Sequence, residues 1–194
     1  EINRLLTDLI SDVLFTPSKD ANLNLLREGI DPTKIQFVGN VMIDTLTRIL
    51  PEALRRDIIP RLGLKPQNYI LVTLHRPSNV DNLDILKEIL AALEKISVQL
   101  PVIFPVHPRT RQNITRLGLS GINSGIRLLE PLGYLDFLGL MNSAKGVMTD
   151  SGGVQEETTY LGVPCLTIRP NTERPITIEI GSNQLVASRC EAIV

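Results

Sequence analysis

The chain has 194 residues, of which 43% are hydrophobic and 21% are charged, so its composition is that of a globular protein and excludes a mainly disordered one. This length is enough for one domain, or one and a fraction, with a buried core of its own. The 20 Lys and Arg residues against 21 Asp and Glu give a net charge of -1, which excludes a general positive field for holding nucleic acid or anionic lipid.

The first third of the chain is predicted to alternate short helices and strands. Apolar residues share one helical face over residues 2–10, and an apolar run over 13–16 stops at Pro17, as a buried strand does. The elements that follow are a short helix ended by Gly29, a strand over 35–39 and a helix over about 42–58.

The rest of the chain alternates strands and helices more clearly. The predicted strands cover residues 69–75, 102–107, 126–130, 146–150, 164–168 and 184–187. Helices lie between them, one capped by Asp81 or Asn82, the others over 109–117, 133–143 and 153–161 and from near Pro175. Pro105 is awkward inside a strand and predicts a bend or a late edge.

This alternation predicts the fold class. Strands joined through helices of ten or more residues form βαβ units and pair in parallel. We therefore predict an α/β fold with one doubly wound parallel sheet, in which ligands bind at the carboxyl ends of the strands.

Neither a metal nor a cofactor is predicted. Two cysteines without CxxC spacing and two histidines argue against a disulfide scaffold, a zinc ribbon or a multi-histidine metal site. No apolar run reaches the ~18 residues of a membrane span and no signal peptide opens the chain, so a cytoplasmic location is expected. Because the chain starts at Glu1 and stops at Val194 in what resembles the middle of an element, we expect it to be a piece of a longer protein.

Polar residues gather where the predicted strands end. His75 and Arg76 follow one strand, His107 follows the next, and Arg174 stands shortly after the strand over 164–168. The sequence Thr-Asp-Ser-Gly-Gly over 149–153 leads from a strand into a helix. Parallel strands bring their carboxyl ends to one edge, so these residues are expected on one rim.

The turn over 149–153 has two interpretations. Glycines let a ligand approach the backbone, and the N–H groups and dipole of a helix start favour an anion such as a phosphate or diphosphate. The alternative is a tight turn in which Ser151 caps the helix. Glu156 and Glu157, in the first turns of this helix, either complement its dipole or accept hydrogen bonds from a ribose diol.

The remaining rim residues also keep two interpretations each. His75 could donate to a phosphate oxygen or protonate a leaving group, or it could cap the next loop, and His107 has the same pair of interpretations. Arg174 could pair with a diphosphate or lie solvated at the surface. Phe137 could stack on a base or pack in the core among its leucine neighbours.

Five motifs in order resemble one family, the UDP-N-acetylglucosamine 2-epimerases: TLHRPSNVDN (73–82), PVHPR (105–109), EPLGYLDFLGLMNSA (130–144), TDSGGVQEE (149–157) and TERP (172–175). That family has a two-domain GT-B fold. By resemblance, residues 1–18 are the crossover from a missing N-terminal domain, and 19–194 are the Rossmann-like C-terminal domain, with its end truncated. The expected partners are a UDP-sugar, that missing domain and, at full length, a second copy in a homodimer.

The resemblance also implies residue roles. Ser151, Gly152, Gly153 and Arg174 would hold the UDP diphosphate, Glu157 the ribose hydroxyls and Phe137 the uracil. His75 would act at the diphosphate and the reacting sugar, with Arg76 and His107 as possible further contacts. The reaction interconverts UDP-N-acetylglucosamine and UDP-N-acetylmannosamine by elimination and re-addition of UDP, a step of polysaccharide biosynthesis. The proposed acid and base carboxylates belong to the missing domain.

One departure from the family pattern concerns the segment after the His-Arg pair. Many bacterial members have a second Arg and then a Glu there, tied to an activating UDP-sugar site, whereas Pro77 and Ser78 stand in this chain. Relatives acting on UDP-diacetamido-uronic acids share the Asn-Val-Asp ending of this motif. This departure argues against the activating site, and both kinds of UDP-sugar remain as candidate substrates.

Two different functions would suit the same fold. One is the donor domain of a GT-B glycosyltransferase, which transfers the sugar to an acceptor, and the second is a sugar-nucleotide sensor without catalysis. Many such transferases have two glutamates eight positions apart near this turn. In this chain Pro164 and Cys165 occupy the positions where a partner of Glu156 or Glu157 would stand, which favours the epimerase.

Overall fold

The computed structural model describes residues 2–118 and 125–194. It divides into two compact units, Glu1–Arg48 and Ile49–Val194, and the division falls within helix α3 (Val41–Arg55). This division falls later in the chain than residue 18, where the crossover is predicted to end. The assignment of residues 1–18 to a crossover stays a prediction.

The first unit is a small βαβ arrangement. Strands β1 (Leu14–Thr16) and β2 (Ile35–Phe37) pair in parallel, and α2 (Lys19–Arg27) connects them. The unit also contains α1 (Ile2–Ile10) and the short helix η1 (Pro32–Lys34). Gly29 follows α2 with a φ of 86°, a conformation that favours glycine and ends the helix, as predicted.

The second unit contains one six-stranded sheet. Its strands are β3 (Ile70–Thr73), β4 (Val102–Pro105), β5 (Ile126–Leu129), β6 (Gly146–Thr149), β7 (Cys165–Ile168) and β8 (Asn183–Val186). The spatial order is β5-β4-β3-β6-β7-β8, and each neighbouring pair is parallel. The chain thus builds outward from β3 in one direction, returns to the middle and builds outward in the other, which is the Rossmann order.

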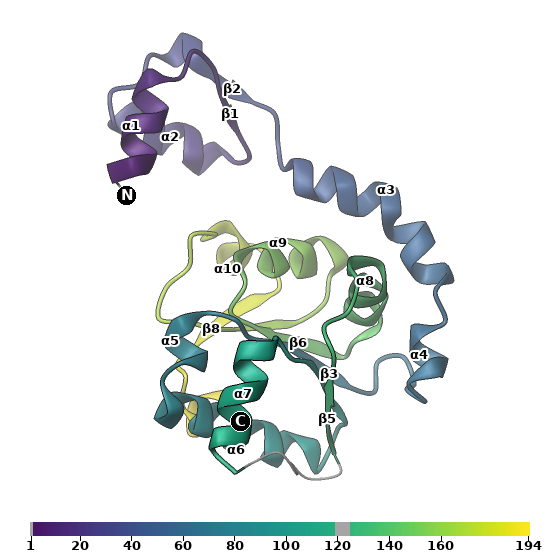
Figure 1. Ribbon diagram of the computed structural model, residues 1–194. Coiled ribbons are helices and arrows are strands. Elements are labelled where there is room, and N and C mark those ends of the chain that lie inside the picture. The colour runs from purple at the N-terminus through teal and green to yellow at the C-terminus, as the bar shows by residue number, and fades with distance from the viewer. Residues whose placement is uncertain (1, 119–124) are drawn as a thin grey trace. The chain divides into compact units, whose positions relative to one another are not determined.

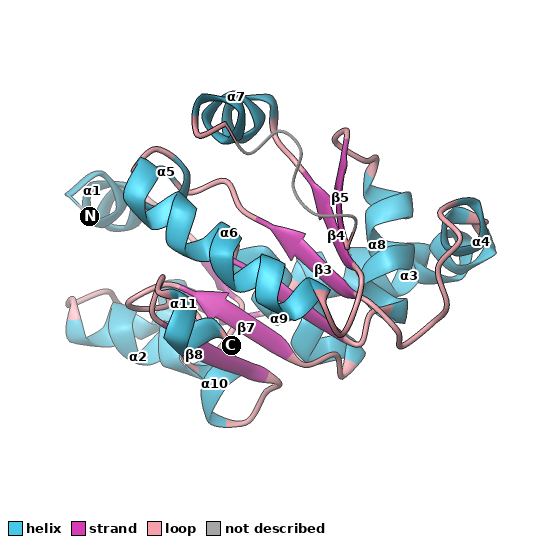
Figure 2. Ribbon diagram, turned by 90° about the horizontal axis from the view of Figure 1, so that it is seen from below, coloured by secondary structure: helices cyan, strands magenta, loops and turns pink. Residues whose placement is uncertain are grey.

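Helices cover both faces of this sheet (Figures 1 and 2). On one face lie α5 (Pro77–Val80), α6 (Leu83–Ser97) and α7 (Pro108–Arg116), and on the other lie α8 (Tyr134–Ser143), α9 (Gly152–Leu161) and α10 (Ile176–Glu179). The short helices α4 (Ile58–Arg61) and α11 (Cys190–Ile193) pack on α8 and α6 respectively. The predicted α/β fold with a doubly wound parallel sheet is confirmed.

The core lies between the sheet and α6. The predicted apolar face of α6 buries Leu86, Ile89, Leu90 and Leu93 against β3 and β4, whose Val72 and Phe104 are fully buried. Of the two predicted caps, Asn82 is the one used, since its Oδ1 accepts from the N–H groups of Asp84 at 3.0 Å and Ile85 at 3.3 Å.

Pro105 is accommodated because it closes β4. The pairing of β4 with β3 ends at Ile103, so no neighbour on that side needs the N–H that proline lacks. On the other side Val106 still donates to the carbonyl of Leu129 at 3.0 Å. Of the predicted bend or late edge, the structure shows Pro105 at the end of the strand. The one-turn helices α4, α5 and α11 were not predicted, because four residues carry no detectable helical period.

Candidate functional site

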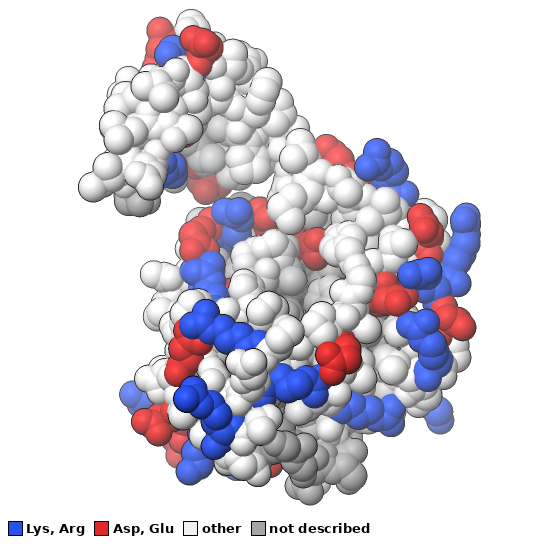
Figure 3. All heavy atoms as spheres, viewed as in Figure 1, with Lys and Arg blue, Asp and Glu red and all other residues white. Residues whose placement is uncertain are grey.

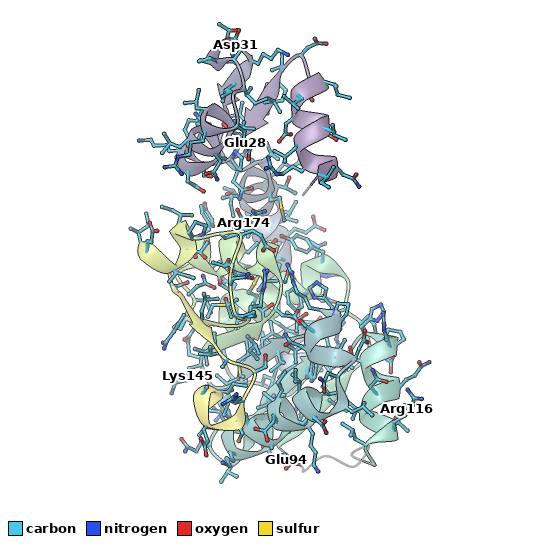
Figure 4. All side chains as sticks on the ribbon, turned by 90° about the vertical axis from the view of Figure 1, so that its left-hand side faces the viewer. Glu28, Asp31, Glu94, Arg116, Lys145 and Arg174 are labelled. Carbon is cyan, nitrogen blue, oxygen red and sulfur yellow. The ribbon has the colours of Figure 1, made fainter. Side chains whose placement is uncertain are left out.

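The predicted rim lies at the switch point of the sheet, where the chain leaves β3 and β6 toward opposite faces. A crevice forms outside the carboxyl ends of two such strands, and it is the usual ligand site of this architecture. The segments that follow β3 and β6 carry His75, Arg76 and the turn over 150–153. In Figure 4, Arg174 lies at this edge of the unit, whereas Lys145, which precedes β6, lies toward the opposite edge.

The N-terminus of α9 is not capped by a side chain. Ser151 occupies the N-cap position in extended conformation, but its hydroxyl makes no capping hydrogen bond. The predicted N-cap position of Ser151 is thus present, without a capping hydrogen bond from its side chain. A Cβ built on Gly152 would meet nothing nearer than Oε2 of Glu173 at 4.0 Å, so packing inside the protein does not require glycine there. The first-turn N–H groups of a helix lack intrahelical acceptors and are therefore available to an anion.

Asp150 ties the segments after β3 and β6 together. Its side chain is completely buried and accepts from the N–H groups of His75 at 3.1 Å and Arg76 at 2.9 Å and from Nδ2 of Asn79 at 3.1 Å. Asn79 also donates to the carbonyl of Ile168 at 2.9 Å and accepts from the hydroxyl of Ser188 at 2.9 Å. Asp150 was not predicted to have a role, although an acidic residue directly after a buried strand is a signal for one.

His75 lies beside this carboxylate. Its side chain is 54% exposed, and its Nδ1 stands 3.0 Å from Oδ1 of Asp150. Arg76 donates from Nε to the carbonyl of Asp150 at 3.1 Å and approaches Glu173 at 3.4 Å. His75 and Arg76 thus lie at the same edge of the sheet as the start of α9, bonded to Asp150.

The loop after β7 is fastened to the start of α9. Gln155 donates to the carbonyl of Ser151 at 3.1 Å and accepts from the hydroxyl of Thr172 at 2.6 Å. The same hydroxyl accepts from the N–H of Arg174 at 2.9 Å, and Nε of Arg174 lies 2.9 Å from Oε1 of Glu156. Arg174 is therefore held beside the first turn of α9, as the diphosphate interpretation requires.

A second ion pair stabilises this loop. Arg169, which is 5% exposed, donates two hydrogen bonds to Glu173, at 2.6 and 2.7 Å. These hydrogen bonds hold the pKa of Glu173 at about 2. The guanidinium of Arg169 is thereby occupied within the protein, which leaves Arg174 as the more exposed arginine of the loop.

Glu157 is almost fully buried between α9 and α8. Only 5% of it is exposed, and Oε1 accepts a hydrogen bond from the Tyr134 hydroxyl at 2.6 Å. Burial raises the pKa of this carboxyl, and the hydrogen bond from Tyr134 opposes that rise. Phe137 stands one turn beyond Tyr134 on α8 and is half-buried. The dipole interpretation suits an exposed first-turn carboxylate better than this one.

His107 serves as the cap of α7. Its Nδ1 accepts from the N–H of Arg109 at 3.3 Å, and Arg109 in turn reaches Asp81 at 2.6 Å. His107 follows β4, the neighbour of β3, so it stands on the same rim. The capping interpretation is thus present in the structure, and a further role in ligand binding stays a prediction.

Over 2–118 and 125–194, no three His, Cys, Asp or Glu side chains are grouped so that they could hold a metal ion. In the same part of the chain, no helix has both the length and the apolar composition needed to cross a lipid bilayer.

A parallel sheet in Rossmann order, with a helix N-terminus and basic side chains at its switch point, defines the Rossmann-like class of α/β domains found in GT-B enzymes. Within that class, the chain belongs to the UDP-N-acetylglucosamine 2-epimerase family, whose model matches residues 1–194. The predicted family is thereby confirmed.

Relatives from archaea and bacteria support this membership. The UDP-N-acetylglucosamine 2-epimerase of Methanococcus maripaludis is 43% identical over 202 residues, which are 100% of this chain and 55% of the relative. A UDP-2,3-diacetamido-2,3-dideoxy-D-glucuronate 2-epimerase of Pseudomonas aeruginosa is 41% identical over 198 residues, with 100% and 54% covered.

A solved structure agrees in the backbone. The crystal structure of Methanocaldococcus jannaschii UDP-GlcNAc 2-epimerase in complex with UDP-GlcNAc and UDP has a TM-score of 0.89 and 44% identity, covering 100% of this chain and 55% of that one. The chain spans about half the length of the relatives it matches.

Proposed function

We propose that this chain is the UDP-binding half of an epimerase that interconverts UDP-N-acetylglucosamine and UDP-N-acetylmannosamine. The observation that carries the proposal is the uncapped N-terminus of α9 at the switch point, with Arg174 on one side and Glu157 one turn further along the helix. Phosphates bind to helix N-termini because free N–H groups and the helix dipole both favour an anion.

Each of the candidate residues would contact a different part of the nucleotide. Ser151, Gly152 and Gly153 would meet the diphosphate, and Arg174 would add a charged contact. Glu157 would accept the ribose hydroxyls. Phe137 would lie against the uracil, because the side of α8 that turns Tyr134 toward Glu157 also carries Phe137 one turn on. His75 and Arg76 would approach the diphosphate from the β3 side, and His107 would stand at the rim beyond them.

This arrangement suits the departure and return of UDP. Elimination breaks the bond between C1 of the sugar and the diphosphate oxygen, so negative charge develops on the diphosphate. The N–H groups of α9, Arg174 and the imidazole of His75 would stabilise that charge by donating hydrogen bonds. We place the groups that remove and return the C2 proton in a second domain, as the family resemblance implies.

The expected partners remain proposals. The first unit exposes many apolar side chains for its size, including Ile10, Phe15 and Val41, and Figure 3 shows few charges on the face it presents. A surface of this kind fits an N-terminal domain of the same protein as partner. A homodimer at full length and a cytoplasmic location also stay predictions.

Two sugars are candidates for the substrate, because two relatives have similar sequence identity to this chain. One is a UDP-N-acetylglucosamine 2-epimerase and the other is a UDP-diacetamido-glucuronate 2-epimerase. Incubating the full-length protein with each UDP-sugar and identifying products by NMR decides between them. Transfer to an acceptor without inversion at C2 would instead favour a glycosyltransferase, and binding without any reaction would favour a sensor.

Replacing Gly152 by Val should weaken binding of UDP to this chain by tenfold or more, because the new side chain occupies the space in front of the helix start. Calorimetric titration with UDP measures the effect. Because Gly152 has no close neighbour and no left-handed φ, the variant should melt at nearly the same temperature as the native chain. An unchanged UDP affinity in the folded variant would reject this binding position.

Replacing Glu157 by Gln should have opposite effects on binding and on stability. The amide keeps an acceptor for Tyr134 but loses the charge that strengthens a ribose contact, so we expect UDP affinity to fall about tenfold or more. Burial raises the folded-state pKa of Glu157, so the native carboxyl favours folding below its unfolded pKa and that contribution is lost as pH rises.

The Glu157→Gln variant should therefore be at least as stable as the native chain at pH 7, and its advantage should shrink toward pH 4. Thermal melts at both pH values check the sign. The ribose assignment is checked with 2′-deoxy-UDP, for which the substitution should cost less than for UDP. Equal losses with both ligands would favour the interpretation in which Glu157 complements the helix dipole.

A further inference from the structure

The hydroxyl of Tyr134 and the carboxylate of Glu157 form a hydrogen-bonded pair across two helices. Tyr134 is the first residue of α8, and Glu157 lies in the second turn of α9, against which α8 packs. The donor and acceptor oxygens are 2.6 Å apart. Tyr134 is 42% exposed whereas Glu157 is 5% exposed, so a surface side chain holds a buried one.

The charged groups near Glu157 include Glu156 and, through its pairing with Glu156, Arg174. Glu156 precedes Glu157 on α9 and repels its negative charge, although Arg174 from the loop after β7 pairs with Glu156. Burial and Glu156 both raise the pKa of Glu157, and the hydrogen bond from Tyr134 lowers it. The Tyr134 hydroxyl is thus the neighbour that favours the ionised carboxylate in a site that disfavours charge.

We propose that Tyr134 is a positioning residue for ribose recognition, which holds Glu157 so that its second oxygen faces the hydroxyls of a ribonucleotide. This inference rests on the proposed function and adds to it a residue and a preference for ribose over deoxyribose. Tyr134 occupies Oε1 with its single O–H donor, and Oε2 is left to accept from the ligand.

The preference for ribose follows from burial. A carboxylate oxygen that is almost excluded from water loses free energy when a ligand offers it no donor. A nucleotide without the 2′-hydroxyl therefore binds less well. The discrimination between ribose and deoxyribose depends on how rigidly the Glu157 carboxylate is oriented. Removing the Tyr134 hydroxyl frees the Glu157 carboxylate to change its orientation while leaving the aromatic ring in place.

The test is the Tyr134→Phe variant of this chain, with Tyr160→Phe on α9 as the matched control. UDP and 2′-deoxy-UDP are titrated into each by calorimetry at pH 8 and pH 6. At pH 8 the Tyr134→Phe variant should bind UDP about tenfold more weakly than the native chain. Its affinity for 2′-deoxy-UDP should change less, so the preference for the ribonucleotide shrinks. The Tyr160→Phe variant should bind both ligands like the native chain.

The two pH values separate orientation from ionisation. Without the hydroxyl the pKa of Glu157 rises further, so more of the carboxyl is protonated at pH 6 than at pH 8. The loss of UDP affinity relative to the native chain should therefore be larger at pH 6. Comparing variant with native chain at each pH cancels the titration of the diphosphate itself. In the Glu157→Gln background, Tyr134→Phe should show no increase of its effect at pH 6.

Two results would overturn the inference, and they differ in what else they reject. UDP affinity within twofold of native and an unchanged preference for ribose in Tyr134→Phe would overturn the positioning role alone. Failure of the native chain to bind UDP would overturn the proposed function and this inference with it.

Discussion

Incubated with UDP-N-acetylglucosamine in deuterated water, this chain should bind the nucleotide but show no exchange at C2 of the sugar. Exchange requires a base within hydrogen-bond reach of the C2 proton, and inversion requires a second group on the opposite face. The carboxylates around the start of α9 are already engaged in the folded protein. Asp150 accepts from the loop after β3, Glu156 pairs with Arg174, Glu157 accepts from Tyr134, and Glu173 accepts from Arg169.

His75 remains as a half-exposed group at this rim, and by the proposed arrangement it faces the diphosphate. One imidazole cannot serve both faces of C2, and an open site also lets water intercept an eliminated intermediate. The measurement is proton NMR of the C2 signal over time, with a full-length relative as positive control. Exchange above background that disappears in a His75→Gln variant would contradict the expectation and place a base within these 194 residues.

The largest stability effect is expected from Phe104→Ala. Phe104 lies on β4, is completely buried and belongs to the core between the sheet and α6. Removing a fully buried phenyl group costs the transfer free energy of the ring and leaves a cavity that the neighbours fill only in part. We expect the free energy of unfolding of the Ile49–Val194 unit to fall by about 3–5 kcal/mol.

Urea unfolding followed by far-ultraviolet circular dichroism measures this loss, since the chain contains no Trp for fluorescence. The denaturant midpoint should fall while the slope stays the same. Ile180→Ala is the control, because Ile180 is 80% exposed and its truncation should change the free energy by no more than about 0.5 kcal/mol. A loss below about 1 kcal/mol for Phe104→Ala would mean that this position is not part of a packed core.

Much of the fold could be predicted because each element has a local signature. The apolar run before His75 indicates a strand covered on both faces, and the spacing of Leu86, Ile89, Leu90 and Leu93 indicates one helical face. Both signatures depend on neighbours along the chain, and the structure confirms both elements. The one-turn helices α4, α5 and α11 were missed because a single turn contains too few residues to show a period.

The departure after the His-Arg pair also has a structural counterpart. Pro77 and Ser78 begin the one-turn helix α5, in which a proline at the first position suits the fixed φ of its ring. Asn79, in the same turn, is buried and bonded to Asp150. The segment in which this chain departs from the bacterial pattern therefore joins the loops after β3 and β6 through a hydrogen bond.

The order of strands and helices, the parallel sheet and the rim on which His75, Gly152 and Arg174 fall could all be predicted from the sequence, because periodicity and connection length act locally. The hydrogen-bond partners of these residues, in contrast, are known only from the folded structure. That Asp150 is a buried acceptor for the segment after β3 and that Tyr134 holds Glu157 both depend on contacts between segments distant in sequence. Such contacts follow from how the sheet brings its strand ends together, and hydropathy along one segment contains no information about them.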